Sequence, residues 1–177
     1  MSQYQYHLFQ ATVGWVALLG SDKGLRRLSL KPTPQEALDE LGTDFDRAVN
    51  EPDGFLKVQG QVESYLGGDV GALDEVDLDL SDTPPFFSAA WRACRQIPAG
   101  ETRSYAWLAA AAGRPLAARA AGQAMARNRL ALIVPCHRVI ASDGDLRGYG
   151  GGGLKVKAGL LAKERVSSVQ RGSHPGQ

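Results

Sequence analysis

The sequence contains few cysteines, few histidines and no long hydrophobic run. Two cysteines and three histidines in 177 residues are too few for a disulfide framework, and none has the spacing of a structural zinc site. No apolar segment is long enough to span a bilayer, and the N-terminal residues lack the basic start and apolar stretch of a signal peptide. We therefore expect a cytoplasmic protein of one domain or two small ones, without membrane association.

The net charge of +1 conceals a strong asymmetry between the two halves of the chain. Residues 1–82 carry 6 Lys and Arg against 15 Asp and Glu, a net charge of −9, whereas residues 83–177 carry 14 against 4, a net charge of +10. Most of these basic residues are arginines, which suit phosphate contacts and release counterions from a polyanion. The second half is expected to bind a polyanion. The alternative is that the two halves simply attract each other.

The first half has the pattern of a mixed α/β domain. Alternating apolar residues on both sides of the polar turn at residues 21–24 predict a β-hairpin. Residues 33–42 predict a short helix, and the segment VDLDLSD predicts a strand because it alternates with period two. The segment GFLKVQGQVESYLGGD predicts a second helix, closed by two glycines. Four residues are expected to pack on its buried face: Leu56, Val62, Tyr65 and Leu66.

The second half opens with a predicted amphipathic helix. Thr83 is a plausible N-cap, and Pro84 suits the first helical turn. Phe87, Trp91 and Cys94 then fall on one helical face, so Cys94 is expected to be a core thiol and not a reactive one.

Two short helices with a tight connection follow. Ser104 can cap a helix that ends at Gly113, and Pro115 can start another that runs to about Arg127. This is a helix-turn-helix pattern, although the pattern alone does not separate DNA binding from a plain helical hairpin. The segment LKVKAGLLAKE predicts a last amphipathic helix, before a polar tail at residues 167–177 that we expect to be disordered.

Cys136, His137 and Arg138 stand side by side between two apolar runs. A cysteine protease needs its histidine directly against the thiol, but neighbouring residues on an extended backbone point to opposite faces, so a water would have to bridge them. An inert core cysteine fits poorly with the two basic neighbours. These neighbours are expected to lower the pKa of the thiol and favour the nucleophilic thiolate.

The stretch IVPCHRVI resembles the active-site signature of the O6-alkylguanine-DNA alkyltransferases, a family of suicide DNA-repair methyltransferases. The segments RQIPAGETRSYAWLA, AARAAGQAMARN, GYGGG and KAGLLAKE follow the order and spacing of that family over residues 84–164, and the first half resembles it more weakly. The resemblance implies an α/β (α+β) fold. It would have an N-terminal mixed domain at 1–82, ribonuclease-H-like in this family, and a helical DNA-binding domain at 83–166 with a winged-helix-like helix-turn-helix.

The resemblance also implies the chemistry. Cys136 would accept the alkyl group from O6 of guanine in a single displacement, once per molecule and without a cofactor or metal. His137 would take the thiol proton through a water, and Glu164 would orient the imidazole. Asn128 would hold the active-site turn, and Tyr105 would reach guanine N3. The resemblance implies further contacts to the base: the Met125 side chain, the carbonyls of Cys136 and Val139, and the amides of Tyr149 and Gly150.

The implied partner is double-stranded DNA that contains O6-alkylguanine, bound by a monomer, and O4-alkylthymine is left open as a second lesion. The target base must leave the stack at a cost of a few kcal/mol. Arg119 would enter the stack as a finger, on a helix whose small residues, including Ala120 and Gly122, let it approach the narrow minor groove. Arg129 and Ala131 replace prolines found in the family, and Ala131 predicts a roomier pocket.

Two other functions remain open at this point. Alkyltransferase-like relatives bind DNA and flag lesions but lack the reactive cysteine, whereas Cys136 is present in this chain. A helix-turn-helix regulator with a sensor cysteine would need a sensor or dimerisation element, and the sequence contains no recognisable one.

Overall fold

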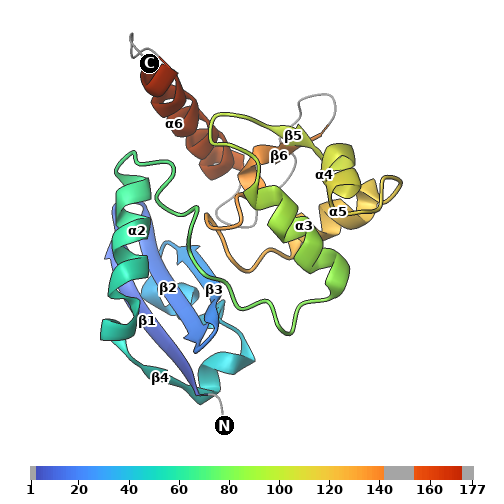
Figure 1. The fold of residues 1–177 in the computed structure, drawn as a ribbon. Helices are drawn as coiled ribbons and strands as arrows, with labels where there is room; N and C mark the ends of the chain where they lie inside the picture. The colour runs from blue at the N-terminus through green and yellow to red at the C-terminus, as the bar shows by residue number, and fades with distance from the viewer. Residues whose placement is uncertain (1–2, 142–153, 173–177) are drawn as a thin grey trace.

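The computed structural model describes residues 3–141 and 154–172, and it places a sheet-containing half beside a helical half (Figure 1). The mixed α/β fold class is confirmed, and the division into domains at residue 82 stays a prediction. One continuous cluster of buried side chains includes residues from both halves, such as Val16, Val62, Trp91 and Val134. Within the described residues, no helix is long and apolar enough to cross a membrane.

The first half is built on a four-stranded sheet in the order β3-β2-β1-β4. Strands β1 (Tyr4–Ala11), β2 (Gly14–Ser21) and β3 (Gly24–Lys31) form antiparallel neighbours, and β4 (Ala48–Asn50) pairs with β1 in parallel. The predicted hairpin is therefore confirmed. A side chain on Gly24 would meet the Asp77 carbonyl oxygen at 2.7 Å, and its φ is +147°, so only glycine fits this turn.

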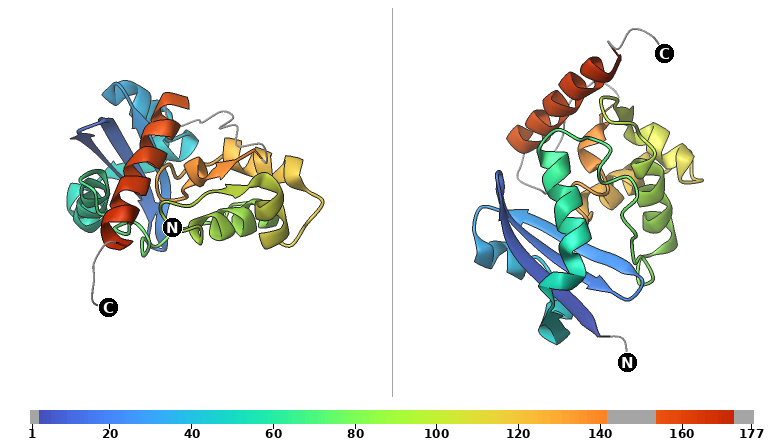
Figure 2. Two further views of the ribbon diagram at one scale, coloured as in Figure 1. Left: turned by 90° about the horizontal axis from the view of Figure 1, so that it is seen from above. Right: turned by 60° about the vertical axis from the view of Figure 1, so that its left-hand side comes forward.

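Helices cover both faces of the sheet (Figure 2). Helix α1 (Pro34–Asp39) begins after Thr33, whose hydroxyl accepts a hydrogen bond from the Glu36 amide, and packs on one face. Two 3₁₀ turns, η1 (Thr43–Arg47) and η2 (Pro52–Phe55), lead to helix α2 (Leu56–Leu66) on the other face.

One predicted core residue of α2 is wrong. Val62, Tyr65 and Leu66 are buried, but Leu56 is 64 % exposed. Leu56 lies six positions before Val62, which turns its side chain well away from the buried face at 3.6 residues per turn.

The strand predicted from VDLDLSD is also wrong. Among the described residues this segment forms a single β-bridge, in which the Leu25 amide donates to Asp77 and the Asp79 amide donates to Leu25, each at 2.9 Å. Two acidic residues of the segment instead join Asp44 around the buried Arg26, which donates to Asp79 at 2.9 Å, to Asp82 at 2.8 Å and to Asp44 at 3.0 Å. A buried guanidinium needs such partners, and this need outweighs the strand pattern.

The second half contains helices α3 (Pro85–Arg95), α4 (Tyr105–Ala111), α5 (Ala118–Ala126) and α6 (Leu154–Gly172). The 3₁₀ turn η3 (Cys136–Arg138) and a parallel pair of short strands, β5 (Arg103–Ser104) and β6 (Val139–Ile140), lie between them. Ser104 caps α4 as predicted by accepting from the Trp107 amide at 3.0 Å. The Trp91 indole of α3 donates to the Ala124 carbonyl of α5 at 2.9 Å, which fixes the helix-turn-helix pair on α3.

Three boundaries in this half differ from the predictions. Pro84, and not Thr83, occupies the N-cap position of α3, and the Thr83 hydroxyl instead accepts a hydrogen bond from Arg129. Helix α5 begins at Ala118, three residues after Pro115. Helix α6 continues to Gly172, so residues 167–172 are helical where a disordered tail was expected.

Candidate active site

The aliphatic segment before Cys136 is a series of buried turns. The Val134 amide donates to Leu130 at 2.9 Å, and Leu132 has a φ of +69°, a left-handed conformation that costs a leucine roughly 1–2 kcal/mol. Strand β3 clamps the start of this segment, because Leu28 exchanges backbone hydrogen bonds with residues 129 and 131. Such stored strain is characteristic of segments that present functional groups.

Asn128 ties this segment to the thiol. Its side-chain amide donates to the Val134 carbonyl at 2.9 Å and to the Cys136 sulfur at 3.2 Å. Its oxygen accepts from the Leu130 amide at 2.9 Å. The contacts fit the role expected of Asn128, which remains a prediction.

Cys136 lies in the 3₁₀ turn η3 and is 9 % exposed. The extended backbone assumed from the sequence is thus wrong. The expected acidic thiol is wrong as well. Burial raises the pKa of Cys136 above the ordinary value of 9.0, although the Asn128 hydrogen bond and the Lys157 charge act against this rise. A thiol of this kind carries its proton at neutral pH, so a base must remove the proton when the sulfur reacts.

His137 and Glu164 form a buried pair that can act as this base. The imidazole Nε2 lies 2.9 Å from Glu164 Oε1, and both side chains are fully buried. Burial lowers the pKa of His137 below 6.5, although Glu164 opposes this. Burial would raise the pKa of Glu164, but hydrogen bonds from His137 and Arg138 lower it to about 2. A neutral imidazole held by a carboxylate is suited to accept a proton.

Two further residues hold Glu164 and were not assigned a role from the sequence. Arg138 donates to both carboxylate oxygens, at 3.0 Å and 2.6 Å, and also to the Ile97 carbonyl at 2.6 Å. The Tyr65 hydroxyl, from α2 of the first half, donates to Glu164 Oε2 at 2.9 Å. Burial raises the pKa of Tyr65, which keeps the phenol protonated as a donor. The sequence signal for Arg138 was its position beside His137, whereas Tyr65 looked only like a core residue.

Lys157 is a third residue missed from the sequence. It is 1 % exposed, and its ammonium group donates to the Val139 carbonyl at 2.8 Å. That carbonyl is one of the acceptors expected for the guanine amine. Lys157 therefore places a buried positive charge close to both the thiol and a predicted base-binding atom.

The remaining predicted residues lie on α4 and α5 or between residues 141 and 154 of the sequence. Tyr105 is half-buried, and its ring packs against Gly122. Arg119 is exposed near the start of α5, Ala120 beside it is half-buried, and Met125 is buried. Tyr149 and Gly150, like the glycine cluster at 150–153, lie outside the described residues. Cys94 is fully buried, as expected of a core thiol, and burial raises its pKa.

Comparison with known proteins decides the family. Residues 85–166 match the model of the 6-O-methylguanine DNA methyltransferase DNA-binding domain. A methylated-DNA–protein-cysteine methyltransferase of Methanosarcina barkeri is 37 % identical over 90 % of this chain and 96 % of its own length. The chain belongs to the methylated-DNA–protein-cysteine methyltransferase family. The constitutive member of this family in Bacillus subtilis is 43 % identical over 94 % of this chain and 98 % of its own.

Solved structures agree with this family assignment. The crystal structure of Mycobacterium tuberculosis OGT in complex with DNA aligns with a TM-score of 0.75 and 35 % identity, over 92 % of this chain and 94 % of that one. The methyltransferase fold therefore extends over both halves of the chain, including the first half that supplies Tyr65.

Proposed function

We propose that this protein repairs alkylated DNA by transferring an alkyl group from O6 of guanine to Cys136. It is an enzyme of the methylated-DNA–protein-cysteine methyltransferase type. The observation that carries the proposal is a thiol in the same 3₁₀ turn as a buried imidazole, which is held in turn by a buried carboxylate. This chain of thiol, base and orienting group is how proteins activate a nucleophile.

The transfer forms one bond and breaks one bond. The Cys136 sulfur bonds to the alkyl carbon as the bond between that carbon and guanine O6 breaks, and the thiol proton passes through a water to Nδ1 of His137. The departing guanine gains a proton, for which the Tyr105 hydroxyl at N3 is the proposed donor. The product is a thioether. No step of the reaction restores the free thiol of Cys136, so each molecule reacts once.

The same proposal assigns roles to the DNA-binding residues. Helix α5 enters the minor groove, where its small residues Ala120 and Gly122 allow close approach, and Arg119 fills the gap left by the flipped base. Met125, Val139, Tyr149 and Gly150 contact that base. The protein acts as a monomer, with residues 1–82 as a domain that supports the active site. The contact from Tyr65 to Glu164 supports this role of the first half.

The stoichiometry of repair tests the proposal. When a duplex with O6-methylguanine is in tenfold excess, we expect about one lesion to be repaired per protein molecule, because the thioether does not turn over. The measurement is the number of guanines restored per protein at long times. Continued repair beyond one equivalent would contradict suicide transfer, and tight binding without repair would favour a lesion-flagging module.

Substitution of the proposed finger separates binding from chemistry. Arg119→Ala is expected to slow repair in duplex DNA at least tenfold, because the flipped state loses a stabilisation worth a few kcal/mol. Reaction with free O6-benzylguanine needs no flipping and is measured in parallel. Equal slowing of both reactions would rule out the finger role.

A further inference from the structure

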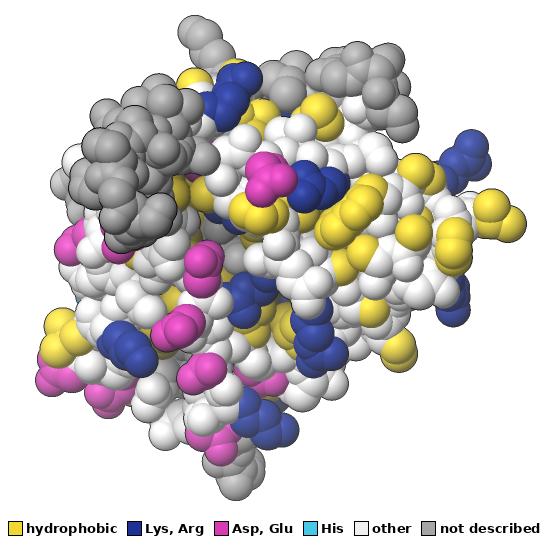
Figure 3. Space-filling view, turned by 45° about the horizontal axis from the view of Figure 1, so that its top comes forward, with side chains coloured by type: hydrophobic (Ala, Val, Ile, Leu, Met, Phe, Trp, Pro, Cys, Tyr) yellow, Lys and Arg dark blue, Asp and Glu magenta, His cyan; other side chains and the backbone are white. Residues whose placement is uncertain are grey.

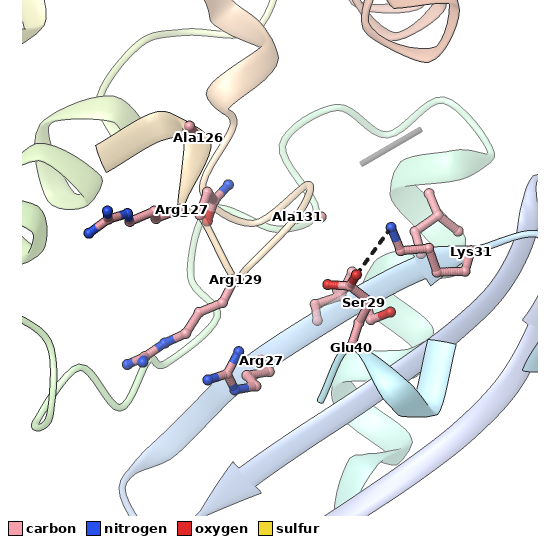
Figure 4. Close-up of a pocket in the computed structure, with 11 residues that line it drawn as sticks. Arg27, Ser29, Lys31, Glu40, Ala126, Arg127, Arg129 and Ala131 are labelled. Atoms are coloured by element: carbon pink, nitrogen blue, oxygen red, sulfur yellow. Dashed lines mark ion pairs between the residues drawn. The ribbon is translucent and has the colours of Figure 1, made fainter. Parts of the chain in front are cut away.

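A basic cleft lies between strand β3 of the first half and the turn that follows helix α5 (Figure 4). Its volume is about 200 Å³. Asn128, which holds the Cys136 thiol, also lines this cleft, so the cleft borders the active-site turn. Four cationic side chains line it against one carboxylate: Arg27, Lys31, Arg127 and Arg129 against Glu40.

Only part of this positive charge is neutralised. Lys31 pairs with Glu40 at 3.6 Å, and Arg129 pairs with Asp82 at 2.6 Å. Among residues 3–141 and 156–165, neither Arg27 nor Arg127 has a carboxylate within ion-pair distance. Arg26, next to Arg27, is by contrast surrounded by three aspartates. The cleft thus keeps excess positive charge where the acidic first half meets the basic second half.

The arrangement of Arg27 makes this excess charge costly. Arg27 is half-buried, and burial lowers its pKa. The neighbouring Arg129 also lowers this pKa, whereas the charges of Asp44 and Asp82 act in the opposite direction without reversing the shift. In Figure 4 the side chains of Arg27, Arg127 and Arg129 extend toward the same side, while the Lys31–Glu40 pair lies at the other end. Like charges that share a desolvated site repel, and an anion between them would relieve the repulsion.

Two of the residues that line the cleft, Ser29 and Arg129, also hold a buried polar atom. Within the described part of the chain, the Ser29 hydroxyl and Nε of Arg129 are buried with no hydrogen-bond partner, and Ser29 is 7 % exposed. Buried donors without a partner are rare in native proteins and frequently belong to a site for an ion. Guanidinium and hydroxyl donors match the oxygen atoms of a phosphate group.

We propose that this cleft is an oxyanion site, separate from the reaction centre, that takes a phosphate group of the DNA backbone. The choice of DNA rests on the proposed repair function. One wall of the cleft is the C-terminal end of α5, the helix proposed to bind DNA. At roughly 1.5 Å per residue, Arg127 lies about 12 Å along the chain direction from Arg119, so a bound duplex could supply the phosphate. Free phosphate is the other possible source of the same chemistry.

The DNA arm of the test uses Arg27→Gln with Lys23→Gln as the matched control. Lys23 carries the same charge on the same half but lies exposed in the turn before β3. Binding of an undamaged duplex is measured at several salt concentrations, and repair of a duplex is compared with reaction of free O6-benzylguanine. In Arg27→Gln we expect the slope of log affinity against log salt to fall by about 1, as for the loss of one phosphate contact. We also expect a lower ratio of duplex to free-base rate, and neither change in Lys23→Gln.

The second arm uses inorganic phosphate and thermal unfolding. Phosphate is expected to raise the unfolding temperature of the wild type more than that of Arg27→Gln. If phosphate stabilises the wild type more than Arg27→Gln while both proteins bind DNA equally, the oxyanion site is supported. The claim that it takes a phosphate group of DNA is then wrong. If neither DNA binding nor phosphate stabilisation depends on Arg27, the site is overturned. Arg127→Gln, which removes the other cation without an ion pair among the described residues, repeats both arms in case Arg27→Gln fails to fold. Methyl uptake by the wild type is measured separately, so failure of this site is distinguishable from failure of the repair function.

Discussion

Glu164→Gln is expected to slow alkyl transfer by roughly 10²–10⁴-fold, the range that a positioned general base contributes. The carboxylate accepts from His137, Arg138 and Tyr65 at once. A glutamine offers one oxygen and turns an amide donor toward groups that are themselves donors. It therefore cannot orient the imidazole or stabilise the positive charge that forms on it.

The same substitution is expected to destabilise the fold. Arg138 is 5 % exposed and would lose its only described counter-charge. Breaking a buried pair in this way costs about 3–5 kcal/mol, which lowers the unfolding temperature by roughly 10 °C in a chain of this size.

Two further variants show whether the loss of rate and stability in Glu164→Gln arises from the contacts of this carboxylate. Tyr65→Phe keeps the packed ring and removes one donor, so a smaller loss of rate is expected than for Glu164→Gln. Glu101→Gln removes an exposed ion pair with Arg103, worth less than about 1 kcal/mol, and should leave both rate and stability unchanged. A wild-type transfer rate in folded Glu164→Gln would show that the carboxylate has no part in the reaction.

The pH profile of transfer is expected to be flat from about pH 6.5 to about pH 9. Burial keeps the pKa of His137 below 6.5 and raises the pKa of Cys136 above 9.0. The base is therefore neutral and the thiol protonated over this interval. Below the pKa of His137 the rate should fall tenfold per pH unit, because the protonated imidazole cannot accept the thiol proton. Single-turnover rates with a free alkylated base measure this without the pH dependence of DNA binding. A rate that rises steadily from pH 7 to 9 would indicate direct ionisation of the thiol and no base.

The same groups make the free energy of unfolding depend on pH. The pKa of His137 is lowered on folding, so the unfolded chain binds more protons, and stability falls as the pH drops below 6.5. Glu164 adds a further loss as the pH falls from 4.5 toward its folded pKa of about 2. Cys136 has the opposite sign, because its pKa is raised, and its contribution is lost as the pH rises above 9.0.

The sequence predicted much of the fold because its local signals agree with its tertiary contacts. The hairpin at residues 21–24, the Ser104 cap and the buried Cys94 all depend on neighbours close in the chain. The strand prediction for VDLDLSD failed because Asp79 in this segment pairs with Arg26, which lies more than fifty residues away in the chain.

The site was predicted less completely for the same reason. Local pattern located Cys136 and His137 but gave the wrong direction for the pKa of Cys136, since burial depends on the whole fold. Tyr65 lies 99 residues from Glu164, and no periodicity of its helix separates a hydrogen-bonding phenol from a packing ring.

The charge asymmetry between the two halves of the sequence is visible on the surface of the structure. On the face shown in Figure 3, most Asp and Glu side chains lie toward the lower left, over the sheet-containing half, whereas the right-hand side carries Arg and Lys among hydrophobic side chains. Attraction between the halves, the alternative raised by the sequence, exists at Arg129, which pairs with Asp82. Arg27 and Arg127 remain without such pairs among the described residues, which is why we assign them to an external anion.

The most direct test of the account is the mass of the protein after reaction with a duplex that contains O6-methylguanine. The wild type and Cys94→Ala should each gain one methyl group, located on the peptide that contains Cys136, while Cys136→Ser should gain none. A methyl group on Cys136→Ser, or on any other residue of the wild type, would contradict the assignment of Cys136 as the acceptor.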